Sequence, residues 1–146
     1  MYRSSRSPRR SLDLARVLLV DDNLTSRLTL QTVLEAGGYQ VDSAASGAEA
    51  IRKLDQREYE LVLTDLRMEC PETGLRVLAH ARMMDYKPAT ALITTYQDST
   101  SRGFRRGDGT VLIEPEDLPE LLGRVADLIS ERATRRVERE LVAAKR

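Results

Sequence analysis

The sequence predicts one α/β domain, a doubly wound sandwich in which five parallel strands are covered by helices on both faces. Short, wholly apolar runs alternate with segments whose apolar residues recur every three or four positions, the periodicity of amphipathic helices. Apolar runs without polar alternation are typical of strands that are buried on both faces of a parallel sheet. The length of 146 residues suits a single domain core.

The first half of the chain is expected to supply three strands and two helices. In order, these are a strand over Arg16–Val20, a helix capped by Asn23 and ended by Gly37–Gly38, a strand over Tyr39–Ala45, a helix opened by Ser46–Gly47, and a strand over Leu61–Asp65. Asparagine is favoured at helix N-caps and glycine just beyond helix ends, so these residues mark the boundaries. The third strand ends on a carboxylate, Asp65.

The second half is expected to add two strands and to end in a long helix. In order, we expect a loop through Glu69–Pro71 to Gly74, a helix over Leu75–Met84 that Lys87–Pro88 breaks, a strand over Ala91–Thr95, a short or irregular helix within Gln97–Gly109, a strand over Thr110–Ile113, and a helix from Glu116 or Asp117 onward. Proline disfavours helical geometry in the residue before it. The stretch 97–109 is polar and rich in glycine, so a helix there is not expected to pack well.

The composition excludes several classes of protein. Lys plus Arg equals Asp plus Glu at 23 each, so no net charge draws the chain to nucleic acid or acidic lipid. The single cysteine, Cys70, rules out an internal disulfide and fits a reducing cytoplasm. No apolar run approaches the ~18 residues that span a bilayer. We expect a cytoplasmic protein with a disordered basic tail over residues 1–12, a globular domain over 13–130 and a helical extension over 131–146.

The polar residues that end the predicted strands are expected to meet at one edge of the sheet. Right-handed crossovers place all strand carboxyl ends together, and this edge would receive Asp21, Asp22, Asp65, Thr94, Thr95 and Glu114. Two unit charges about 4 Å apart repel by about 4 kcal/mol at an effective dielectric constant of 20. A divalent cation removes that repulsion, and Mg²⁺ takes one or two carboxylates. Alternatively, Asp21 and Asp22 only cap the next helix.

The same edge carries the groups that an aspartyl phosphate needs. A carboxylate nucleophile such as Asp65 beside Mg²⁺ suits phosphoryl transfer. The hydroxyl of Thr94 can hydrogen-bond a phosphoryl oxygen. Thr94 can equally serve only to satisfy backbone groups, and the residues leave both roles open.

Four motifs occur in a specific order along the chain: Val17–Asn23, Leu61–Met68, Leu92–Tyr96 and the Glu114–Pro115 position. Over residues 16–129 the sequence resembles the receiver domains of two-component response regulators. The resemblance implies a flavodoxin-like fold, a phosphoryl group accepted on Asp65, and Mg²⁺ held by Asp21, Asp22, Asp65 and the backbone carbonyl of Arg67. It also implies that Thr94 is the switch hydroxyl and that a histidine kinase or phosphotransfer protein is the partner.

Three departures from that family concern its phosphorylation switch. Glu114 stands where the family has a lysine, and its carboxylate would repel the phosphoryl group. Val111 replaces the usual aromatic switch residue, and Glu69–Pro71 lengthens the loop after Asp65 so that Gly74 comes one residue late. Glu114 can also face solvent or act as an extra acidic ligand, which the sequence leaves open.

The C-terminal extension has two interpretations. Its interleaved arginines and glutamates can form a solvated helix face. Its apolar residues form a narrow stripe of the coiled-coil type, which favours a homodimer or docking to a partner helix: Ile129, Ala133, Val137, Leu141 and Ala144. Nucleic-acid binding is not expected, because no recognisable DNA-reading module follows.

Three functions fit these observations. We prefer a receiver without an output domain, which accepts a phosphoryl group on aspartate with Mg²⁺, signals by protein–protein contact, and is not a turnover enzyme. The alternative is a phosphorylation-independent pseudo-receiver that acts as an interaction module. A third is a Mg²⁺-dependent phosphohydrolase of the haloacid-dehalogenase type, because Asp21–Thr25 approximates Asp-x-Asp-x-Thr, although Asn23 stands where that family needs a second aspartate.

Overall fold

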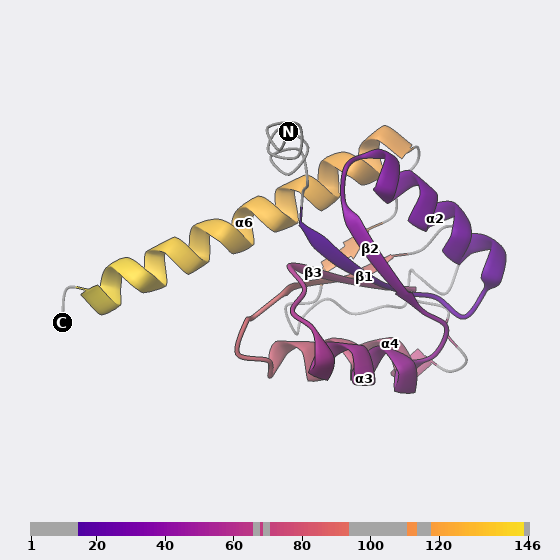
Figure 1. Cartoon of the computed structure of the whole chain (residues 1–146), viewed down its shortest axis with the longest axis horizontal. Coiled ribbons are helices and arrows are strands. Elements are labelled where there is room, and N and C mark those ends of the chain that lie inside the picture. The colour runs from indigo at the N-terminus through magenta and orange to yellow at the C-terminus, as the bar shows by residue number, and fades with distance from the viewer. Residues whose placement is uncertain (1–14, 66–67, 69–70, 94–110, 114–117, 145–146) are drawn as a thin grey trace, which may run out of the picture.

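A five-stranded parallel sheet forms the centre of the protein, with its strands in the order β2–β1–β3–β4–β5. The computed structural model describes residues 15–65, 68, 71–93, 111–113 and 118–144 (Figure 1). The strands are β1 (Arg16–Val20), β2 (Gln40–Ala44), β3 (Leu61–Asp65), β4 (Ala89–Ile93) and β5 (Val111–Ile113). Because β1 lies between β2 and β3, its last residue, Val20, pairs with both Ala44 and Thr64.

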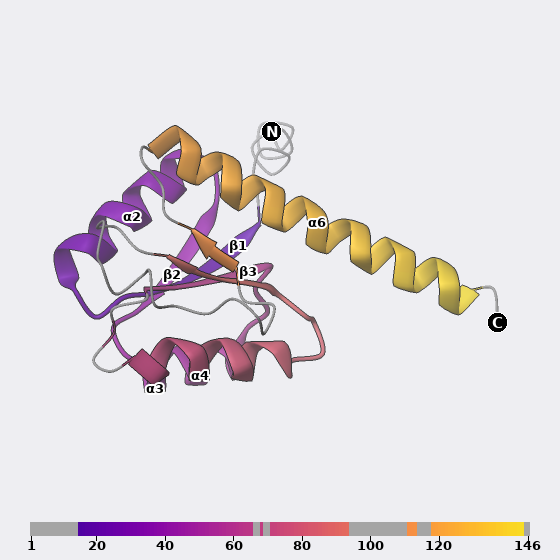
Figure 2. The ribbon, with the colours of Figure 1, turned by 180° about the vertical axis from the view of Figure 1, so that it is seen from behind.

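Helices cover both faces of the sheet, as expected for a doubly wound fold (Figures 1 and 2). They are α2 (Leu24–Ala36) and α6 (Leu118–Ala144) on one face, with α3 (Gly47–Gln56) and α4 (Pro71–Arg82) on the other. Neighbouring strand residues point to opposite faces, so Leu19 and Leu63 join the core under α2 and α6. Leu18 and Val62 join the second core, under α3 and α4.

Side-chain caps start two of these helices where the sequence predicts them. The Asn23 Oδ1 atom accepts a hydrogen bond from the Ser26 amide at 2.9 Å. The Ser46 hydroxyl accepts one from the Glu49 amide at 3.1 Å, and the Glu49 carboxylate accepts one from the Ala45 amide at 2.8 Å. These bonds satisfy amides that a helix start leaves unpaired, so local sequence fixes where α2 and α3 begin.

The predicted loop before Gly74 is wrong in its second half, because α4 already begins at Pro71. Proline is well suited to the first position of a helix, where its missing amide proton is not needed and its φ angle is already helical. Glu72 adds a negative charge to the first turn, which the helix dipole favours. Strand β4 also starts two residues earlier than expected, at Ala89, which pairs with Leu61. The predicted basic tail and the helix expected within 97–109 lie outside the described residues.

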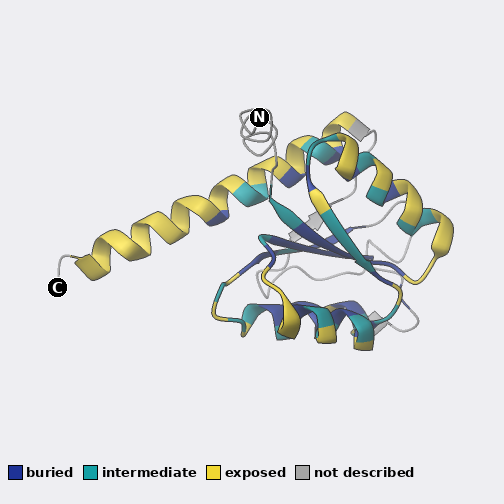
Figure 3. Cartoon of the chain, viewed as in Figure 1, coloured by how far each residue is buried: buried dark blue, intermediate teal, exposed yellow. Residues whose placement is uncertain are grey.

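Helix α6 is the longest element and has two different halves. Its first half packs on the sheet through Leu121 and Val125, both almost fully buried. From Ala133 to Ala144 every residue is exposed, and the helix extends away from the domain (Figure 3). The helix runs without a break through the predicted boundary at residue 130. None of the helices in the described part of the chain is long and apolar enough to cross a membrane.

Candidate metal site

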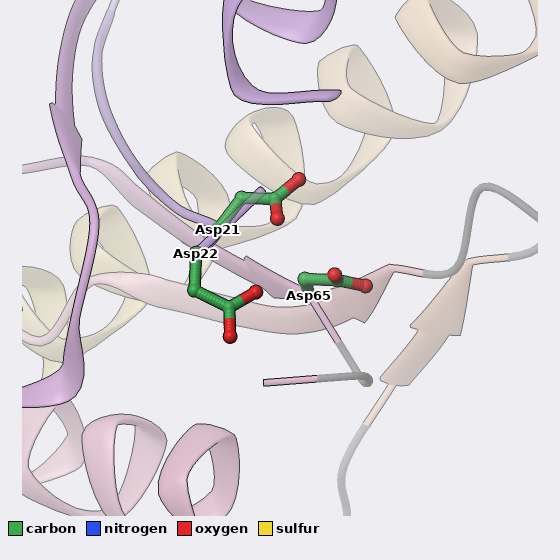
Figure 4. Close-up of side chains that lie close together, drawn as sticks. All are labelled: Asp21, Asp22 and Asp65. Carbon is green, nitrogen blue, oxygen red and sulfur yellow. The ribbon is translucent and has the colours of Figure 1, made fainter. Parts of the chain in front are cut away.

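Three aspartates converge at the carboxyl ends of two neighbouring strands. Asp21 and Asp22 follow β1, and Asp65 is the last residue of β3. One carboxylate oxygen from each lies within 4.8 Å of the others (Figure 4). The pairing of Val20 with Thr64 explains this, because it brings the next residues of both strands side by side. The structure therefore brings together three of the predicted site residues.

Asp21 is held firmly in this cluster although its side chain is not fully satisfied. Its amide donates to the Ala44 carbonyl at 3.0 Å, and its own carbonyl accepts from the Arg27 guanidinium at 2.8 Å. Its Oδ1 atom accepts from the Asn23 amide at 2.9 Å. The other oxygen, Oδ2, is buried and has no hydrogen-bond partner among the described residues. Buried polar atoms are rarely left in this state, so Oδ2 is available to bind an external group.

The electrostatics of the cluster also favour a cation. Burial raises the pKa of Asp21 from 3.8 to about 6. The hydrogen bond from the Asn23 amide opposes this rise, while the negative charges of Asp65 and Asp22 add to it. Without a counter-ion the charged form of Asp21 is therefore disfavoured, and a nearby divalent cation would favour it again.

The donor set fits Mg²⁺. All three groups are carboxylates, the hard oxygen ligands that Mg²⁺ prefers. Asp21 and Asp65 are buried, whereas Asp22 is exposed. An ion at this cluster would thus have fixed ligands on one side and remain open to water and to a phosphoryl oxygen on the other.

Of the two roles proposed for Asp21 and Asp22, helix capping is performed by Asn23 instead. Its side chain accepts the first-turn amide of α2, and Asp21 in turn accepts the Asn23 amide. Asp21 and Asp22 therefore do not cap this helix, and with Asp65 they form the aspartate cluster at the strand ends, which we call the strand-end cluster. Arg67, Thr94 and Glu114, the other residues predicted for this edge, lie outside the described residues.

Two glycines that hold α4 beside the cluster were not recognised from the sequence as part of the site. A Cβ atom at Gly74 would lie 3.3 Å from both the Asp65 carbonyl oxygen and the Thr64 Oγ1 atom. A Cβ atom at Gly47 would lie only 2.7 Å from the Thr73 Cγ2 atom. The first turn of α4 therefore packs closely against β3 and α3. The sequence placed Gly74 at the end of a loop and Gly47 at the opening of a helix, so neither glycine interrupted a predicted helix and no local signal marked these contacts.

Comparison with known proteins agrees with this geometry. The family model of the response regulator receiver domain matches residues 17–126. The transcriptional regulatory protein CpxR homolog of Haemophilus influenzae is 31% identical over 123 residues, covering 83% of this chain and 53% of that protein. The transcriptional regulatory protein PrrA of Mycobacterium tuberculosis is 29% identical over 121 residues, covering 82% and 52%. The chain spans about half the length of these curated relatives.

Among solved structures, the response regulator TrrA from Thermotoga maritima is similar over the whole of its length. The TM-score is 0.66 at 27% sequence identity, covering 79% of this chain and 99% of that one. The TrrA structure is a complex with Mg²⁺ and beryllium fluoride.

Proposed function

The chain belongs to the response regulator receiver domain family, and from this premise we propose that it accepts a phosphoryl group on Asp65 with the help of Mg²⁺. The observation that carries the proposal is the aspartate cluster, with a buried Asp21 oxygen that lacks a hydrogen-bond partner among the described residues. A cluster that only stabilised the fold would bring donors to that oxygen, as buried polar groups normally require. We propose a role in a two-component phosphorelay, with signalling by protein–protein contact.

The chemistry assigned to Asp65 is nucleophilic. A carboxylate oxygen of Asp65 attacks the phosphorus of a phosphohistidine while the bond from phosphorus to the imidazole nitrogen breaks. The electron pair stays on the imidazole, and Asp65 becomes an acyl phosphate. Bound Mg²⁺, held by Asp21, Asp22 and Asp65, would offset the negative charge that these groups share with the phosphoryl oxygens.

Further roles rest on likeness to the family. Arg67 would add its backbone carbonyl to the metal ligands, and Thr94 would hydrogen-bond the phosphoryl group. A histidine kinase or phosphotransfer protein would be the donor, in the cytoplasm. The protein would be modified once per signal and would not be a turnover enzyme. Nucleic acid and membrane are not proposed as partners.

One sequence feature favours a second candidate function, a pseudo-receiver that binds partners without phosphorylation. Glu114 adds a negative charge where the family has a lysine that pairs with the phosphoryl group. Glu114→Lys separates the two candidates. If the chain is a receiver whose switch Glu114 weakens, the lysine variant should hold the phosphoryl group longer than the parent protein. A pseudo-receiver would show no adduct while Glu114 is present, even if the lysine variant forms one.

The phosphohydrolase alternative is not supported. The chain matches the receiver family over residues 17–126. Asn23, which stands where the phosphohydrolase motif needs its second aspartate, is used as the N-cap of α2. Its side chain accepts the Ser26 amide and is therefore committed to the helix.

The test is a Mg²⁺ titration of the full chain, with and without acetyl phosphate, read by intact mass and amide NMR. We expect Mg²⁺ to shift the amides of Asp21 and Asp65, and acetyl phosphate to add one phosphoryl mass that Asp65→Asn abolishes. Cation binding without an adduct would instead support the pseudo-receiver. No response to Mg²⁺ at millimolar concentration would contradict both the metal site and the phosphoacceptor.

A further inference from the structure

The exposed half of α6 is the largest part of the described structure that packs against nothing. This projecting arm, residues 133–144, leaves the domain as a continuous helix (Figures 1 and 3). Val137 and Leu141 are 53% and 58% exposed. A helical segment of about 12 residues is only marginally stable by itself in water, so an unpaired arm with exposed apolar side chains would gain stability from a partner.

Arg132 fixes the place at which the arm leaves the domain. Its side chain is almost fully buried, with Nε donating to the Lys87 carbonyl at 3.0 Å and Nη2 to the Tyr86 carbonyl at 2.7 Å. Lys87 has a φ angle of 47°, unusual for a residue with a side chain. The Tyr86 hydroxyl donates to the Leu54 carbonyl of α3 at 2.9 Å. The arm is therefore presented in a fixed direction.

An uncharged seam runs along α6 and continues through the arm. Its residues are spaced by three or four positions, as in a coiled coil, and all are exposed: Gly123, Ala126, Ser130, Ala133, Val137, Leu141 and Ala144. At about 3.6 residues per turn, this seam lies on a different side of the helix from the sheet-facing residues Leu121 and Val125. Ile129, which the sequence placed in the stripe, instead packs against the core under α6.

The residues beside the seam determine which pairing is electrostatically favourable. Asp127, Glu131 and Glu138 follow one edge, while Arg136 and Glu140 lie on the other, where they form an exposed ion pair at 3.5 Å. In an antiparallel pair of identical helices the same edges meet, so the acidic rows would face each other. In a parallel pair the edge with Arg136 and Glu140, whose two charges cancel, meets the acidic edge of the other copy, so this arrangement has less repulsion between like charges.

We propose that the projecting arm pairs with the arm of a second copy of this chain, as a parallel two-helix interface along the seam. Small residues at most seam positions let two helices approach closely, and Val137 and Leu141 supply the apolar area at the centre of the arm. Arg136 of each copy would leave its weak, exposed ion pair with Glu140 and contact the acidic edge of the other copy. The interface would bring two receiver domains together independently of phosphorylation.

The oligomeric state of the full chain tests this proposal. We expect sedimentation velocity to show a dimer at tens of micromolar protein, and the double substitution Val137→Ser with Leu141→Ser to raise the dissociation constant at least tenfold. Val142→Ser is the matched control, because Val142 is 56% exposed and lies in the same arm but outside the seam. It should leave the dimer intact. Near-ultraviolet and far-ultraviolet circular dichroism would check that each variant retains its fold.

Orientation is tested by crosslinking. In a Cys70→Ser background, Ala133→Cys and Ala144→Cys should each crosslink to themselves with a short bis-maleimide, because a parallel pair brings identical residues together. A mixed crosslink between positions 133 and 144, with none between identical positions, would overturn the parallel arrangement. A monomer at all concentrations, or a dimer that the seam and control substitutions affect equally, would overturn the proposal itself. Binding of the arm to a different protein while the chain stays monomeric would also overturn it.

Discussion

Two regions of the sheet each contain a buried or partly buried aspartate. In one region nearby donors and arginines compensate the negative charge, and in the other the neighbours are further carboxylates. Asp42 on β2 accepts a hydrogen bond from the Tyr59 hydroxyl at 2.8 Å. The guanidinium groups of Arg16 and Arg57 lie 3.9 Å and 3.8 Å from the same carboxylate. Donors on neighbouring elements thus compensate Asp42 within the protein itself.

The strand-end cluster instead places carboxylate beside carboxylate. The Oδ2 atom of Asp21 is buried without a described partner, and the pKa of Asp21 is raised to about 6. Burial also raises the pKa of Tyr59 far above its usual value, so Tyr59 stays neutral and continues to donate to Asp42. A compensated aspartate therefore stabilises the fold, whereas an uncompensated group of aspartates holds repulsion between like charges that a bound cation can relieve.

The largest expected difference between the two regions is in phosphorylation. Asp65→Asn should abolish the acetyl phosphate adduct completely, because the amide is not a nucleophile of the carboxylate type. Asp42→Asn should leave the adduct unchanged. Intact mass of both variants measures this. An adduct that persists in Asp65→Asn would move the phosphoacceptor to another residue.

The second difference concerns Mg²⁺ affinity. Asp21→Asn removes one charged ligand and should weaken binding by about tenfold or more, equivalent to about 1.4 kcal/mol. Asp42→Asn should bind Mg²⁺ as tightly as the parent protein. Titration calorimetry in matched buffer compares the three proteins. Equal affinities for all of them would show that the cation binds elsewhere.

The third difference lies in the pH dependence of stability without metal. The folded-state pKa of Asp21, about 6, is higher than its unfolded value of 3.8, so the folded state binds the proton more tightly. Stability from this group is therefore gained as pH falls from 7 toward 4 and lost as pH rises through 6, by at most about 3 kcal/mol. Urea unfolding in EDTA at pH 5 and 7.5 measures the effect.

Asp21→Asn provides the control for this pH dependence, because asparagine does not titrate. The difference in unfolding free energy between pH 5 and 7.5 should be smaller in the variant than in the parent. The variant should also be more stable than the metal-free parent at pH 7.5. A parent and variant with identical pH profiles would contradict the raised pKa.

The last expected effect belongs to the compensated region. Asp42→Ala leaves the buried Tyr59 hydroxyl without its acceptor and should cost about 1–2 kcal/mol of unfolding free energy. The two arginine pairs should add little, because they are long and partly exposed. The double variant with Tyr59→Phe should recover part of the loss, measured by urea unfolding. A loss that Tyr59→Phe does not change would assign the stability to the arginines instead.

Much of the fold was predictable because it depends on local patterns. Strand β3 was placed correctly at Leu61–Asp65, since a short, wholly apolar run is typical of a strand buried on both faces of a sheet. The start of α4 was missed by four residues, because Pro71 looks the same in a loop and at the first position of a helix. Of the predicted site residues, Asp21, Asp22 and Asp65 were identified as a group from their positions after two strands.

Charged and apolar residues on α6 were harder to place. Arg132 looked like one of several solvated arginines, yet it is buried and bound to the turn before β4. Ile129 looked like part of an exposed stripe, yet it packs on the sheet. The periodicity of a helix shows that it has an apolar side but does not show which side the rest of the protein covers.

The alternation of strands and helices, the helix caps and the grouping of acids at one edge follow from the sequence, because each depends on neighbouring residues or on the rule that parallel strands end together. The tertiary structure decided four other features: the burial of Asp21 Oδ2, the raised pKa of Asp21, the close contact of Gly74 with β3 and the anchoring of Arg132. These features depend on distances between segments far apart in the chain, and only the packed fold sets those distances.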